Sequence, residues 1–140
     1  MSAESEYIRS EVNNTLQTIT LLEDLLAKRS PTKYEVIAMG KLLQDVYTGL
    51  ERILRSLLEQ QGMRIKKAES WHKELLLTAK ERSLVSQAEF EAFRALLLFR
   101  HMEIHGYGFM LDKKRLRELG EPLPQLCRSF LEKVKELNAS

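Results

Sequence analysis

An arginine, a histidine and a tyrosine lie close together in the segment of the chain that is richest in reactive side chains. Four residues separate Arg100 from His105, and Tyr107 follows two positions later. A histidine ionises near neutral pH and can take a proton from the 2′-hydroxyl of RNA. An arginine keeps its charge and can hold two phosphate oxygens. The pattern therefore predicts cleavage of a nucleic acid by acid–base chemistry that needs no metal.

The spacing also constrains how Arg100 and His105 could act together. On a helix, five residues turn about 500°, so the two side chains lie about 140° apart and about 7.5 Å along the axis. They converge if the helix loosens at Gly106. They also converge if each meets its copy from a second chain across a two-fold axis, which would bring two arginines and two histidines to one cleft.

Other interpretations of the same residues remain open. Arg100 could be a solvated helix residue, and His105 a cation that the helix dipole favours at a C-terminus. His101 and His105 stand four apart on one helical face, as in zinc sites. The intervening Glu103 points away from that face and cannot act as their base, so we predict no metal site. We expect His101 to support Arg100 or to contact phosphate.

Composition excludes a surface that is basic throughout. The 140 residues carry 22 lysines and arginines against 20 acids, a net charge of +2. Contact with RNA must therefore come from a local patch or from a groove between two chains. The basic runs at 64–67 and 113–117 are interpreted as solvated faces, which would help to hold a polyanion if they flank the cleft.

The remaining sequence features predict a cytoplasmic protein. Cys127 is the only cysteine and falls at helical core spacing, which predicts a small buried side chain in a reducing compartment. The first residues lack the basic and apolar segments of a secretory signal. No apolar run is long enough to span a bilayer.

Hydrophobic residues recur at helical spacing along most of the chain, which predicts an all-α bundle in one domain spanning 1–140. Capping boxes at Thr32 with Glu35 and at Ser86 with Glu89 mark two helix starts. We expect connectors at 62–69 and at 113–122. The predicted helices are four principal ones with shorter pieces, at about 4–29, 32–61, 70–81, 87–106 and 123–137.

The string from Phe99 through Arg100 and His105 to Gly108 resembles the HEPN superfamily, and specifically HepT-like toxins. The upstream Ser70-Trp71-His72-x-x-Leu75-Leu76 resembles the same branch. The resemblance implies a four-helix bundle with short additional helices. It also implies a homodimeric, metal-independent endoribonuclease that uses no cofactor and leaves 2′,3′-cyclic phosphate and 5′-hydroxyl ends.

Within that resemblance, Arg100 and His105 of both protomers would form one composite catalytic site. The implied partner is an antitoxin of the MNT nucleotidyltransferase type, which would neutralise the toxin by transferring AMP to Tyr107. Two alternatives remain open. The chain could be a non-catalytic helical binding partner of a nucleotidyltransferase, or a purely structural dimeric bundle.

Overall fold

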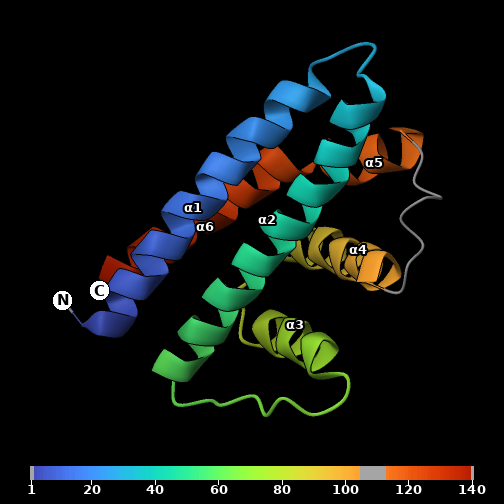
Figure 1. Ribbon diagram of the computed structural model, residues 1–140. Helices are drawn as coiled ribbons and strands as arrows, with labels where there is room; N and C mark the ends of the chain where they lie inside the picture. Colours follow the sequence, from blue (N-terminus) through green and yellow to red (C-terminus); the bar gives the residue numbers. More distant parts are fainter. Residues whose placement is uncertain (1, 105–112, 140) are drawn as a thin grey trace.

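The computed structural model describes residues 2–104 and 113–139, and at 103 and 104 it describes the backbone alone. Within these ranges the chain forms helices and no strand, which confirms the predicted all-α bundle (Figure 1). In chain order the helices are α1 (Ala3–Leu26), α2 (Lys33–Gln60), α3 (Trp71–Glu81), α4 (Gln87–Ile104), α5 (Lys113–Gly120) and α6 (Leu123–Ala139).

Helices α1 and α2 form a long antiparallel hairpin (Figure 1). The predicted capping box at the start of α2 is present in both directions. Glu35 N donates to Thr32 Oγ1 at 3.1 Å, and Thr32 N donates to Glu35 Oε1 at 2.8 Å. After α2, Gly62 adopts a φ of +80°, a left-handed conformation that glycine enters without a steric penalty. The predicted start and end of this helix are therefore confirmed.

The two helices of the hairpin pack closely at Gly49 of α2. A Cβ atom at this position would overlap Thr15 Oγ1 of α1 and would lie 3.4 Å from Thr15 Cβ. The Thr15 hydroxyl donates to Glu11 O at 2.8 Å, so it is held in its own helix. A glycine is needed here because the backbone of α2 lies directly against this threonine.

Helix α4 is fixed at its first turn by a buried carboxylate. Glu89 and Ser86 form the predicted capping box, with hydrogen bonds of 2.8 and 3.1 Å. The same Glu89 carboxylate accepts from Lys133 Nζ of α6 at 2.8 Å. Further along, Phe93 packs edge-on against Phe130 of α6, with ring centroids 5.5 Å apart. These contacts orient α4 and so set the direction in which its last turns run.

Helix α5 occupies a segment for which the sequence predicted a connector, and that prediction was wrong. Leu116 and Leu119 are buried three positions apart, which gives this short basic helix an apolar side. Its Arg117 donates from Nη1 to Leu26 O at 3.0 Å and from Nη2 to Lys28 O, at the C-terminal end of α1. The cations of this run therefore stabilise carbonyl groups that the end of a helix leaves without a partner.

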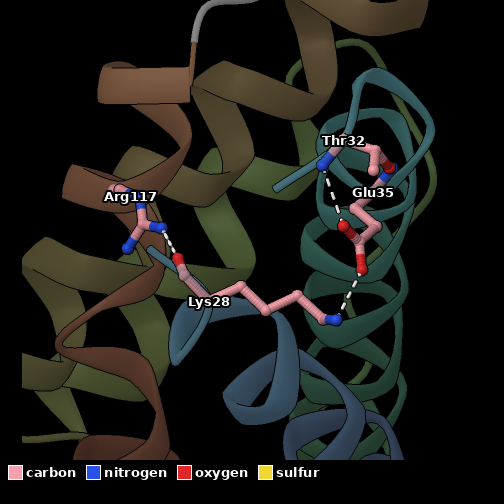
Figure 2. Close-up of polar contacts among 4 residues, drawn as sticks. All are labelled: Lys28, Thr32, Glu35 and Arg117. Atoms are coloured by element: carbon pink, nitrogen blue, oxygen red, sulfur yellow. Dashed lines mark hydrogen bonds and ion pairs between the residues drawn. The ribbon is translucent and has the colours of Figure 1, made fainter. Parts of the chain in front are cut away.

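Figure 2 shows that Lys28 connects Arg117 of α5 to the capping box of α2. Lys28, whose carbonyl accepts from Arg117, also forms an ion pair of 2.8 Å with Glu35, which belongs to the capping box of α2. Hydrogen bonding to Lys28 is the main cause that lowers the pKa of Glu35. The contacts join α5, the end of α1 and the start of α2.

Helix α6 returns alongside α1 and brings the two ends of the described chain together (Figure 1). Ser5 Oγ donates to Asn138 Oδ1 at 3.0 Å, and Asn138 Nδ2 donates to Ser5 O at 2.9 Å. Cys127 of α6 is fully buried, as predicted, and burial raises the pKa of its thiol to about 12.

All the helices in the described ranges contribute to one hydrophobic cluster. Its members include Ile8 of α1, Leu43 of α2, Leu75 of α3, Phe93 of α4 and Leu116 of α5, together with the apolar face of α6. Within the described part of the chain, no helix is both long and apolar enough to cross a membrane.

Candidate functional site

A cleft of about 680 Å³ opens between the start of α1, the second half of α2, the start of α3 and the end of α4. The lining segments from α1, α2 and α4 are far apart in the sequence, so the cleft exists only in the folded chain. Its lining residues are Ala3, Glu4, Tyr7, Thr48, Glu51, Arg52, Arg55, Ser56, Glu59, Lys67, Trp71, His72 and Arg100.

Arg100 is the residue of the predicted catalytic pair that the structure places in this cleft. It lies near the end of α4 and is partly buried. Its guanidinium carbon is 5.9 Å from the centre of the Tyr47 ring on α2, within the range of a cation–π contact. The contact holds the charge of Arg100 at the inner wall of the cleft, beside α2.

Tyr47 provides a neutral surface beneath that arginine. Burial raises the pKa of its phenol far above the usual value, and the negative charge of Glu51 raises it further, while Arg100 opposes the shift. The phenol therefore stays protonated at physiological pH. An uncharged ring next to Arg100 leaves the positive charge available to an anion in the cleft.

His72 and Glu51 form a close polar pair across the cleft. His72 Nδ1 lies 2.5 Å from Glu51 Oε2. Glu51 comes from the buried side of α2 and its side chain is only 10% exposed, while the His72 side chain is 31% exposed. The imidazole ring also lies against Trp71, with ring centroids 3.9 Å apart and a tilt of 33°.

The chain reaches this pair through a strained residue. Ser70 directly precedes Trp71 and has a φ of +66°, in the left-handed region that non-glycine residues rarely enter. Such a conformation costs about 1–2 kcal/mol. Trp71 also lies close to Arg55 and Lys67, whose charged groups are 5.5 and 5.7 Å from the centre of its ring. The start of α3 is thus packed among cations.

The other charges of the cleft are partly balanced by acids. Arg52 lies 3.5 Å from Glu11, and Arg55 Nε lies 3.7 Å from Glu59. Four lining residues are arginine or lysine and three are glutamate, and one of those three, Glu51, contacts His72. The cleft therefore carries only a small excess of positive charge, which suits a single phosphate group better than a long polyanion.

The other predicted site residues fall elsewhere. His101 is exposed and does not line the cleft. His105 and Tyr107 lie outside the described residues. The same holds for the His101–His105 pair as a metal site, and the described part of the chain contains no cluster of histidine, cysteine or acidic residues able to hold a metal ion.

The two basic runs have different positions. Lys67 of the first run lines the cleft. In the second run, Lys113 donates to Arg29 O at 3.1 Å and Arg117 contacts the end of α1, so this run lies at the closed end of the α1–α2 hairpin. The cleft lies toward the open end, since it is lined by the first turns of α1. Only the first run therefore borders the cleft.

Sequence reasoning missed Glu51 as part of this site and left His72 without a place. A signal for Glu51 was present. Glu51 lies four residues after Tyr47 and three before Leu54, both buried, so it falls on the core side of α2. A carboxylate at such a position requires a partner. The identity of that partner depends on how α3 packs on α2.

An all-helical bundle with an arginine-bearing cleft near the end of its fourth helix is consistent with the HEPN type. Residues 38–140 match the model of the HepT-like protein family, and the chain belongs to this family. The family is associated with ribonuclease toxins, so the chain is a HEPN-type, toxin-like protein. No curated protein and no solved structure matches the chain.

Proposed function

We propose that this protein is a metal-independent endoribonuclease that acts as the toxin of a prokaryotic toxin–antitoxin pair. The observation that carries the proposal is the position of Arg100. It lies in a cleft with a small excess of positive charge in a HepT-like chain, near the end of α4 and five positions before His105 in the sequence. A fixed arginine at this place can bind the phosphate of an RNA strand and offset the charge that develops on it.

The proposed reaction uses the nucleophile that RNA itself carries. The 2′-hydroxyl gives up its proton to a base and attacks the adjacent phosphorus. The bond from phosphorus to the 5′ oxygen then breaks, and an acid gives that oxygen a proton. Arg100 and His105 of two protomers supply the cation and the proton-transfer groups. The products are a 2′,3′-cyclic phosphate and a 5′-hydroxyl.

The test is cleavage of a single-stranded RNA by the purified protein in EDTA. We expect cleavage by the wild-type protein and by Arg94→Ala, because Arg94 is an exposed arginine of α4 outside the cleft. We expect Arg100→Ala and His105→Ala to reduce cleavage by about 100-fold or more. Equal cleavage by all four proteins would refute the assignment, and a folded wild-type protein that does not cleave would favour the non-catalytic binding partner.

If the site is composed of residues from two protomers, cleavage requires the dimer, and the same assay can test this. Light scattering and specific activity are measured over one series of protein concentrations. We expect the specific activity to follow the fraction of dimer. A monomer that cleaves as fast as the dimer would refute the composite site.

The proposed partner is an MNT-type nucleotidyltransferase that transfers AMP to Tyr107. The transferred group would add a bulky anion that mimics RNA phosphate, seven positions along the chain from Arg100. We expect co-expression with such an enzyme to add the mass of AMP to the intact protein, and to remove cleavage activity. Tyr107→Phe should block the mass change. A mass change that persists in Tyr107→Phe would move the modification to another residue.

A further inference from the structure

We propose that His72, oriented by Glu51, is a further catalytic residue of the cleft and acts as the base that takes the proton of the attacking 2′-hydroxyl. The inference rests on the proposed ribonuclease function. It adds a residue to the site, because the base then comes from the start of α3.

The contact with Glu51 fixes which nitrogen of His72 can accept a proton. Nδ1 lies 2.5 Å from Glu51 Oε2. A carboxylate only accepts hydrogen bonds, so Nδ1 carries the hydrogen in this pair. In a neutral imidazole the other nitrogen, Nε2, then has a free lone pair. A carboxylate that holds a histidine in this tautomer and orientation is the arrangement that activates a hydroxyl nucleophile in hydrolases.

The burial of the two side chains suits Glu51 as the orienting carboxylate and His72 as the base. The Glu51 side chain is 10% exposed and the His72 side chain 31% exposed, so the carboxylate is shielded while the ring remains accessible from the cleft. His72 lines the same cleft as Arg100 and Arg55. A phosphate held by these arginines would therefore lie in the cleft that the imidazole borders.

A simple ion pair that ties α3 to α2 is the competing explanation. Helix α3 is already anchored by Leu75, Leu76 and Ala79, which are all buried. The contact of His72 with Glu51 is therefore not needed to hold α3 on α2, whereas it does place the imidazole at the cleft.

The proposed step balances without any further reactant. His72 Nε2 takes the proton of the 2′-hydroxyl as the bond from O2′ to phosphorus forms. The bond from phosphorus to O5′ breaks, and O5′ takes a proton from water. The hydroxide that this leaves then takes the proton held by His72, which restores the residue.

The test compares His72→Gln and Glu51→Gln with Glu74→Gln in the RNA cleavage assay. Glu74 is an exposed glutamate on the same turn of α3 that does not line the cleft, so it is the matched control for the change of glutamate to glutamine. We expect His72→Gln to lower kcat by about 100-fold or more with little change in KM. Glu51→Gln should lower kcat by about tenfold or more. Glu74→Gln should cleave like the wild type.

A second readout does not depend on turnover. In protein labelled with ¹⁵N-histidine, NMR reports the tautomer of each ring. We expect His72 to carry its hydrogen on Nδ1, to lose this preference in Glu51→Gln, and to shift when a 2′-O-methyl oligonucleotide, which cannot be cleaved, is added. Circular dichroism of each variant shows whether it is folded.

The outcomes separate this inference from the proposed function. If the wild type cleaves RNA and folded His72→Gln cleaves equally fast, the inference is wrong and the ribonuclease function stands. If the wild type does not cleave, the ribonuclease function and the base role of His72 both fall. A His72 ring that carries its hydrogen on Nε2, or that does not respond to the oligonucleotide, overturns the inference in either case.

Discussion

The close approach of α1 and α2 at Gly49 makes a prediction whose sign depends on a second residue. Replacing glycine by alanine inside a helix ordinarily stabilises it by about 0.5–1 kcal/mol, because the unfolded chain loses freedom. In Gly49→Ala the new methyl group would overlap Thr15 Oγ1. Overpacking in a tight interior costs about 1–3 kcal/mol. We therefore expect a net loss of about 1–2 kcal/mol in the free energy of unfolding.

Thr15 cannot move away from a methyl group at position 49 without losing a hydrogen bond. Its hydroxyl donates to Glu11 O at 2.8 Å, and rotating the side chain away would break this bond at a cost of about 0.5–1.5 kcal/mol. In Thr15→Ala the overlapping oxygen is gone, and the nearest remaining atom, Cβ, would lie 3.4 Å from the new methyl group, an ordinary contact. Adding Gly49→Ala to Thr15→Ala should therefore stabilise the protein by a few tenths of a kcal/mol up to about 1 kcal/mol.

The assay is urea denaturation of the wild type, the two single variants and the double variant. Unfolding free energies are compared at equal slope with denaturant, so that they report stability alone. We expect a coupling energy of about 2 kcal/mol between the two positions, well above the additivity error of about 0.5 kcal/mol. Additive effects, or a stabilising Gly49→Ala in the wild-type background, would refute the close packing of these helices.

Three further predictions concern named contacts. Arg117→Met should lower the free energy of unfolding by about 1 kcal/mol, since carbonyl groups at the end of α1 lose their donor, and the exposed Lys114→Met is the control in the same thermal melts. Cys127 has its pKa raised to about 12 by burial, so at pH 9 a disulfide reagent should label it only as fast as the protein unfolds; immediate labelling of the folded protein would contradict this. Hydrogen bonding to Arg128 lowers the pKa of Glu23, so the stabilisation is present above the unfolded pKa of about 4.3 and lost as pH falls through the folded value. The difference between the urea midpoints of wild type and Arg128→Met at pH 7 should therefore shrink as the pH is lowered below about 4.

Local sequence rules predicted most of the helices, because capping residues mark their starts and the spacing of hydrophobic residues marks their length. The capping boxes at Thr32 and Ser86 marked the starts of α2 and α4, and Gly62 marked the end of α2. Helix α5 was missed because two leucines, Leu116 and Leu119, among several charged residues are too short a pattern to indicate a helix. A helix this short gains its stability from packing on the rest of the bundle, which local propensity does not report.

The candidate site, too, could be predicted from the sequence only in part. The spacing of reactive residues pointed to Arg100, and the structure places this arginine in the cleft, but its catalytic role stays a prediction. The pairing of His72 with Glu51 spans 21 positions and depends on how α3 turns back onto α2, so no local pattern contained it. The roles of His105 and Tyr107 stay predictions, because both lie outside the described residues.

The first helix has a consequence for protein engineering. The family match begins at residue 38, yet α1 contributes Ile8, Val12 and Ile19 to the common core and Tyr7 to the wall of the cleft. An expression fragment limited to the matched residues would expose the apolar sides of α2 and α6 that α1 covers. An exposed apolar surface of this kind promotes aggregation. The residues that match the family model are therefore fewer than those that build the common core.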